Sequence, residues 1–105
     1  MSEVSLAIRQ AARGYAEVVE GKSCSQSSFK RKNKAFLYIG EQGGRHKVMF
    51  RLSESMNEAK ELADLHPQDF QIGSNGWVTA RFSDDEPMRK RVWKRWLDES
   101  YSLTA

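Results

Sequence analysis

The stretch GSNGWVTARF, residues 73–82, decides the fold because it joins a tight turn to a strongly alternating segment. Its Gly-Ser-Asn-Gly start is typical of a β-hairpin turn, since asparagine and glycine tolerate the positive φ angles that such turns require. The segment that follows has two unlike faces, with Val78, Ala80 and Phe82 on one and Trp77, Thr79 and Arg81 on the other. We therefore predict a strand here, paired through the turn with the preceding DFQI.

The segments upstream predict a second group of strands. KVMFRL, residues 47–52, alternates in the same way, with Val48, Phe50 and Leu52 opposite Lys47, Met49 and Arg51. SFKRKNKAFLYIG, residues 28–40, predicts two short strands around a turn, and EQGGRH predicts the next turn. The second of these short strands has Phe36 and Tyr38 on one face and Ala35, Leu37 and Ile39 on the other. Residues 15–28 either extend the first helix or cross over to the sheet.

Three segments predict helices. Residues 4–13 carry apolar residues at helical spacing, and residues 53–67 combine an apolar stripe with a Ser55–Glu58 capping box and a terminating Pro67. The last helix is expected to begin after SDDE, with Pro87 in its first turn and Asp84, Asp85 and Glu86 near its positive end.

This last helix, which contains MRKRVWKRWLDES, is amphipathic. At 100° per residue its tryptophans, Trp93 and Trp96, fall on the apolar side, so we expect them to be buried together with Val48, Phe50, Val78 and Phe82. The cations on the other side have partners four residues away, which predicts the pairs Lys94–Asp98 and Arg95–Glu99. The helix is therefore expected to close the core and not to read nucleic acid.

The expected element order is helix, three strands, helix, two strands, helix. This order predicts an α+β fold, a two-layer sandwich in which the helices cover one face of an antiparallel sheet and leave the other face at least partly open. A length of 105 residues indicates a single domain, residues 1–105. The 39% hydrophobic and 30% charged content indicates a folded, soluble protein, and no apolar run is long enough to span a membrane.

Few side chains suggest chemistry. There is no phosphate-binding glycine loop, no nucleophile motif and no zinc-ligand spacing, so we expect no enzyme activity and no cofactor or metal. His46 and His66 are twenty residues apart and lack an evident catalytic partner. Cys24 is the only cysteine, which favours a reduced, cytoplasmic location and an unmodified thiol that only packs. The acidic cluster before the last helix is explained by the helix dipole without a metal.

The basic charge is concentrated in one segment. The chain has a net charge of +3, yet residues 30–51 alone carry seven cations and one anion. Together with an aromatic ring, outward-facing cations on a sheet would suit phosphates and stacked bases. The candidate nucleic-acid-binding residues are Lys30, Arg31, Lys32, Lys34, Arg45, Lys47, Arg51, Trp77 and Arg81. The alternative is a solvated hairpin whose lysines keep edge strands from pairing with other molecules.

Several of these segments also carry a family resemblance. SFKRKNKAFLYIG, KVMFRL, the region of Pro67, GWVTARF and the ending WKRWLDESYSLTA are similar to the MmcQ/YjbR family, so the chain is identified as one MmcQ/YjbR-like domain. The resemblance implies a secretion-chaperone-like fold, α-β(3)-α-β(2)-α, and a DNA-binding role assigned by analogy with a double-wing fold. It implies no catalytic residues. Many relatives have a basic residue before the Gly-Trp pair, where this chain has Ser74 and Asn75.

The expected function is that of a small cytoplasmic, non-enzymatic binding protein. Its leading expected partner is DNA or another nucleic acid, bound weakly and without sequence preference through the basic hairpins. The alternative is a protein-interaction or chaperone-like module with a protein partner, because the fold analogy also points to chaperones that hold segments of other proteins. A basic sheet without compensating acids favours the first reading, and an exposed apolar patch favours the second.

Overall fold

The computed structural model describes residues 3–23 and 25–105, so the prediction for the Cys24 thiol lies outside the described residues. The helices are α1 (Glu3–Arg13), α2 (Met56–Leu65) and α3 (Lys90–Ser102). The strands are β1 (Val18–Ser23), β2 (Gln26–Arg31), β3 (Lys34–Gln42), β4 (Arg45–Arg51), β5 (Phe70–Ile72) and β6 (Trp77–Phe82). None of the helices in this part of the chain is long and apolar enough to cross a membrane.

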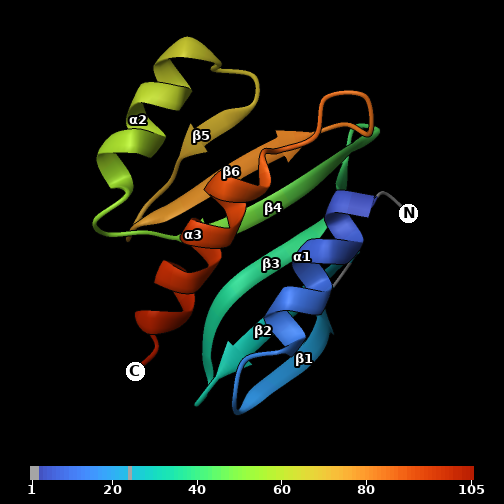
Figure 1. Cartoon of the computed structure of the whole chain (residues 1–105), viewed down its shortest axis with the longest axis vertical. Coiled ribbons are helices and arrows are strands. Elements are labelled where there is room, and N and C mark those ends of the chain that lie inside the picture. Colours follow the sequence, from blue (N-terminus) through green and yellow to red (C-terminus); the bar gives the residue numbers. More distant parts are fainter. Residues whose placement is uncertain (1–2, 24) are drawn as a thin grey trace.

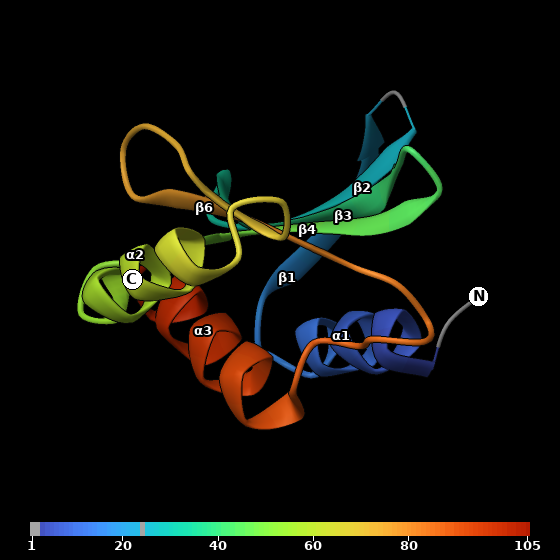
Figure 2. The same cartoon turned by 90° about the horizontal axis from the view of Figure 1, so that it is seen from above.

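The strands form one antiparallel six-stranded sheet in the order β1-β2-β3-β4-β6-β5. All three helices lie against one face of this sheet, as the edge-on view in Figure 2 shows, and Figure 1 shows α1 and α3 crossing it. The predicted two-layer α+β fold with helices on one face is therefore confirmed. The sheet has one strand more than predicted, because the ambiguous segment crosses over and pairs with β2 as the edge strand β1.

Three hairpins turn through residues with positive φ, and the predicted β3–β4 turn does so at Gly43 and Gly44, with φ values of 61° and 79°. Asn75 and Gly76 have φ values of 57° and 84° between β5 and β6, as expected for a tight hairpin turn. Lys32 and Asn33 have φ values of 52° and 65° between β2 and β3, although neither residue is glycine. The right-handed twist of paired strands favours this turn geometry over its mirror image, which explains why lysine adopts it here.

The core lies between the sheet and the helices. Its strand residues include Phe29, Leu37, Ile39, Val48, Phe50, Val78, Ala80 and Phe82. The six residues that the sequence predicted to be buried together are all in this cluster, and Trp93 and Trp96 are 2% and 0% exposed. Trp96 places its ring edge against Phe50 at 5.8 Å and against Phe70 at 5.9 Å.

A β-bulge changes which face Phe36 occupies. The β2–β3 register pairs Phe29 with Leu37 but Lys30 with Ala35, so Phe36 is the extra residue of β3. It is completely buried and lies against the rings of Tyr15 and Tyr101, at 6.0 and 5.2 Å. The prediction that Phe36 shares a face with Tyr38 was wrong, because the extra residue reverses the alternation at this point of the strand.

The hydroxyl of Ser100 bridges two backbone groups at the bulge. Its Oγ accepts a hydrogen bond from the Arg51 amide at 2.9 Å and donates one to the Phe36 carbonyl at 2.5 Å. Ser100 is only 1% exposed, so water cannot take over these bonds. A side chain of α3 thus connects β3 and β4 next to the bulge, which interrupts the pairing of β3 with β2.

A carboxylate from α3 also caps α2. Glu99 accepts hydrogen bonds from the Ser53 amide at 2.6 Å, the Ser55 amide at 3.1 Å and the Ser55 hydroxyl at 2.8 Å. The predicted Ser55–Glu58 capping box is therefore wrong. The Glu99 carboxylate, from a helix distant in sequence, supplies the hydrogen-bond acceptor and the negative charge that a local side chain usually provides at a helix N-terminus.

Glu58 points instead across to α3. It forms an ion pair with Arg95 and accepts a hydrogen bond from Trp96 Nε1 at 2.8 Å. Partial burial would raise the pKa of Glu58, but the bonds from Arg95 and Trp96 outweigh it and hold that pKa below its usual range. The predicted Arg95–Glu99 pair is wrong, because both residues have partners near α2, whereas Lys94–Asp98 is confirmed at 2.7 Å.

The last helix begins later than predicted. Its first helical residue is Lys90, and the backbone at Arg89 is still extended, with a ψ of 132°. Met88 is 8% exposed and packs into the core, which keeps the chain extended up to this point. Pro87 and the acidic residues 84–86 therefore precede the helix, and no acidic residue lies in its first turn.

Candidate nucleic-acid interface

The sheet face that the helices leave uncovered is called the open face here. The strand register places on it Val19, Gly21, Gln26, Ser28, Lys30, Ala35, Tyr38, Gly40, Gln42, Arg45, Lys47, Met49, Arg51, Gln71, Trp77, Thr79 and Arg81. This set has five cations and, within the described strands, no carboxylate. Basic charge is therefore concentrated on the side of the sheet opposite the helices (Figure 2).

Four of the predicted site residues come together on β4 and β6. Lys47 is the cross-strand partner of Arg81, and Arg51 is the cross-strand partner of Trp77. The sequence prediction that these outward rows coincide agrees with this register. Lys47 has no ion-pair or hydrogen-bond partner among the described residues, so its ammonium group is available to a ligand.

The β2–β3 hairpin distributes its cations differently from the prediction. Lys30 belongs to the open face, and Lys32 is exposed in the turn. Arg31 faces the helices, where its guanidinium lies 4.8 Å from the centre of the Tyr101 ring and its Nε 4.0 Å from the Glu17 carboxylate. Lys34 is the cross-strand partner of Arg31 and is exposed at the end of the hairpin. Arg31 and Lys34 are therefore not brought together with the cations of the open face.

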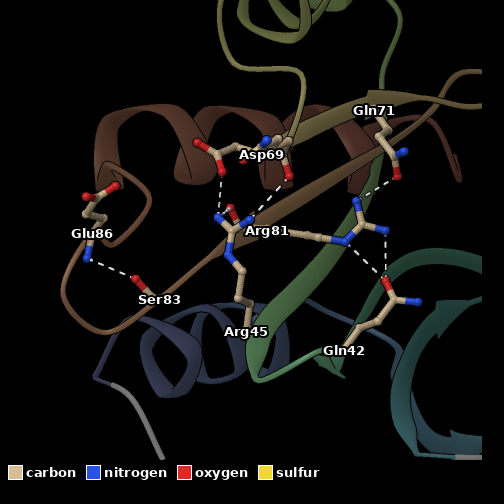
Figure 3. A network of polar contacts seen from close by, with 8 residues as sticks. Gln42, Arg45, Asp69, Gln71, Arg81, Ser83 and Glu86 are labelled. Carbon is tan, nitrogen blue, oxygen red and sulfur yellow. Dashed lines mark hydrogen bonds and ion pairs between the residues drawn. The ribbon is translucent and has the colours of Figure 1, made fainter.

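Arg45 already has an acidic partner. Its Nη2 lies 2.6 Å from the Asp69 carboxylate and 3.0 Å from the Arg81 carbonyl, and its Nη1 donates to the Gln68 carbonyl at 3.2 Å. Figure 3 shows this side chain reaching toward Asp69, the residue just before β5. Arg45 thus fastens the segment before β5 to β4 and β6, and its charge is largely compensated.

Arg81 is held by neutral groups instead. Its Nε and Nη2 donate to the side-chain oxygen of Gln42 at 3.1 and 2.8 Å, and its Nη1 donates to that of Gln71 at 2.6 Å, as Figure 3 shows. A guanidinium has five N–H donors, so two remain for another acceptor. The two glutamines fix the orientation of Arg81 without neutralising it.

Two aromatic rings meet on the open face. Tyr38 of β3 and Trp77 of β6 have ring centroids 5.3 Å apart, with their planes tilted by 50°. Both side chains are half-buried. Arg51 lies beside them and donates from Nε to the Asn75 carbonyl at 3.1 Å. The sequence prediction named Trp77 and missed Tyr38, although the alternation of Tyr38 with Leu37 and Ile39 was a signal for it.

The histidines and acids show no metal-binding cluster. No group of three or more histidine, cysteine or carboxylate side chains that could hold a metal occurs among residues 3–23 and 25–105. His46 lies on the helix side, with its Nε2 2.8 Å from the Asp84 carboxylate and its ring 5.2 Å from Phe82. Asp84 therefore interacts with a strand residue and not with the first turn of α3.

A separate groove of about 730 Å³ lies in the helical layer. Its apolar lining comes from α2, β5, β6 and the start of α3, with Leu62, Phe70, Phe82, Met88 and Val92. Arg89, Arg91 and Glu86 also line it, and none of these three side chains has an ion-pair partner among the described residues. The paired Glu58 and Arg95 belong to the same groove.

Comparisons with known proteins address the fold. No family model matches the sequence, and no curated protein is significantly similar to it. A similar solved structure is the crystal structure of Deinococcus radiodurans protein DR2400, described as a DUF419 domain, with a TM-score of 0.70 and 17% sequence identity. The match covers 91% of this chain and 74% of that one. The chain therefore has the fold of that DUF419 domain.

Proposed function

We propose that this protein is a cytoplasmic, non-enzymatic member of the MmcQ/YjbR family that binds nucleic acid weakly through its open face. One observation carries the proposal: five cations and no carboxylate occupy the open face within the described strands. Only Arg45 among these cations is paired with a carboxylate. Lys30, Lys47, Arg51 and Arg81 keep their charge for phosphate groups.

Binding of this kind is expected to lack sequence preference. The helices lie behind the sheet, so none of them can enter a major groove from the open face. The contacts are then mainly to phosphates, with a Kd on the order of 10⁻⁴–10⁻⁶ M at physiological salt. The affinity should fall steeply as salt rises, because binding releases the counterions condensed on the nucleic acid.

Exchanging Lys47 and Arg51 together for glutamine tests the proposal. We expect weaker binding to every sequence, and a slope of log K against log salt that is flatter by about 2, one for each lost phosphate contact. The matched control changes Lys90 and Arg91 to glutamine, because both are exposed on α3 in the other layer. Fluorescence anisotropy with labelled DNA from low to physiological salt measures both variants. Equal losses in the two double variants, or no binding by the wild type at low salt, would contradict the proposal.

The groove favours a second candidate, a protein-interaction function. Its apolar lining and the unpaired Arg89 and Arg91 suit an acidic amphipathic segment of a partner protein. A labelled peptide of alternating leucine and glutamate clusters should bind the wild type, and Arg89→Glu with Arg91→Glu should weaken that binding at least tenfold. DNA should displace the peptide little, since Arg81 is the only open-face residue among the described residues that also lines the groove. An unchanged peptide affinity in the double variant would rule out this site.

A further inference from the structure

The Tyr38–Trp77 pair has an unusual position for two large aromatic rings. The other ring contacts of the molecule lie mainly on the helix side, where burial of apolar surface explains them. Tyr38 and Trp77 belong to the open face and are only half-buried, although they contact each other across β4 at 5.3 Å. Their remaining ring surface faces solvent on the side of the sheet that carries the unpaired cations.

Cations lie both beside this ring pair and further along the strands. Arg51 is the cross-strand partner of Trp77, so it lies beside that ring at the same level of the sheet. Lys47 and Arg81 are cross-strand partners further along the strands, beyond the Met49–Thr79 pair. Arg51 is four positions after Lys47 in β4, which corresponds to a distance of roughly 13 Å at about 3.3 Å per residue. One position that can hold a phosphate therefore lies beside Trp77, and a second lies beyond the level of Tyr38.

The geometry points to single-stranded nucleic acid as the ligand of the open face, with bases stacked on Trp77 and Tyr38 and phosphates of the same strand on Arg51 and on Lys47 with Arg81. This inference rests on the proposed nucleic-acid binding and adds the class of nucleic acid. Only single strands, loops and ends present unstacked base faces, because in a duplex the bases stack on one another. Aromatic side chains next to a cationic surface are the usual means of binding such strands without sequence preference.

The guanidinium of Arg81 is already held in one orientation before a phosphate binds. Gln42 and Gln71 hold its guanidinium in place through three N–H donors, and two donors remain for a phosphate oxygen. Because amide oxygens do the holding, the full positive charge is retained. A fixed guanidinium also loses less conformational entropy on binding than a mobile one.

The tryptophans provide a site-specific signal. Trp93 and Trp96 are 2% and 0% exposed and lie in the core on the helix side, whereas Trp77 is half-buried on the open face. A base that stacks on Trp77 should quench its fluorescence and leave the emission of the two core tryptophans unchanged. Trp77→Phe keeps an aromatic ring at the position and removes only the fluorophore.

The experiment measures anisotropy and tryptophan emission with a labelled oligo-thymidine strand and with a duplex of equal length, at about 50 mM salt where phosphate contacts are strong. The wild type should bind the single strand at least several-fold more tightly than the duplex, with quenching. Trp77→Leu should weaken single-strand binding about tenfold, the loss of one stacked base, and duplex binding less than twofold. Trp77→Phe should retain most of the single-strand affinity without the quenching. Circular dichroism and thermal unfolding verify that each variant is folded.

The outcomes separate this inference from the proposed function. Equal affinity for single strand and duplex, or single-strand binding that Trp77→Leu does not weaken, overturns the stacking site and leaves phosphate binding by the open face in place. Failure of both oligonucleotides to bind the wild type overturns the proposed function itself. If Trp77→Leu proves unfolded, Tyr38→Leu replaces it as the test variant and Tyr38→Phe, which keeps the ring, as its control.

Discussion

Replacement of Trp96 by alanine is expected to lower the free energy of unfolding by about 3–5 kcal/mol, the usual cost of truncating a fully buried large aromatic residue. Trp96 is 0% exposed, and its ring packs edge-on against Phe50 and Phe70. Its Nε1 also donates a hydrogen bond to Glu58 of α2. The substitution therefore leaves a cavity between α3 and the sheet and removes a link to α2 at the same time.

Urea unfolding followed by far-ultraviolet circular dichroism measures this loss. The matched control is Trp77→Ala, which removes the same side chain from the half-exposed open face and should cost much less. Trp96→Phe keeps part of the packing and should recover part of the stability. Equal destabilisation by the two alanine variants would contradict the packing role assigned to Trp96. Small domains are typically stable by about 5–15 kcal/mol, so Trp96→Ala is also expected to lower the melting temperature markedly.

Replacement of Ser100 by alanine is expected to cost about 2–4 kcal/mol, although it removes a single oxygen atom. The hydroxyl forms hydrogen bonds with the Arg51 amide and the Phe36 carbonyl. Each buried polar group left without a partner lowers the free energy of unfolding by about 1–3 kcal/mol. The residue is 1% exposed, so water is not expected to replace the hydroxyl. The variant should also increase the hydrogen-exchange rate of the Arg51 amide, which reports on the β3–β4 connection directly.

Ser102→Ala is the control for this prediction. It removes the same hydroxyl from the same helix, but Ser102 is exposed and its Oγ only donates to the Asp98 carbonyl within α3. We expect a change within about 0.5 kcal/mol. An equally small effect for Ser100→Ala would show that the sheet tolerates the bulge without the bridging hydroxyl.

The fold class could be predicted from the sequence because alternation in β4 and β6 is nearly perfect. Val48 and Phe50, like Val78 and Phe82, occupy every second position and lie in one core. The bulge at Phe36 could not be predicted in this way. One extra residue in a strand leaves the local composition unchanged, and only the pairing with β2 reveals it. The edge strand β1 was ambiguous because polar Glu20 and Lys22 occupy its helix-side positions while Val19, on the other face, is 68% exposed.

The helix caps show a different limit. Ser55 and Glu58 have the spacing of a capping box, yet tertiary partners on α3 engage both of them. The residue that caps α2 is Glu99, which lies 44 positions after Ser55 in the chain. Local patterns indicate which side chains could form a cap, whereas the packing of α2 beside α3 decides which side chain does.

The candidate site was predictable to the extent that the alternation of side chains between the two faces of a strand defines it. This alternation correctly put Lys47, Arg51, Trp77 and Arg81 on one face. It also separates Lys30 from Arg31, which the clustering of cations in the sequence had grouped together. The pairing of Arg45 with Asp69 depends on where the segment before β5 lies in space, which composition and spacing do not encode.

Residues 99–101 have a consequence for biosynthesis. Glu99 caps α2, Ser100 bridges β3 and β4, and Tyr101 stacks on Tyr15 at 4.3 Å and donates to the Ala16 carbonyl at 2.6 Å. Three consecutive residues of α3 thus connect it to three other parts of the molecule. The ribosome adds these residues after all six strands have been made. The part of the sheet's apolar face that α3 covers therefore remains uncovered during translation until α3 has emerged. Nascent chains in that interval present the surface that promotes aggregation and that chaperones recognise.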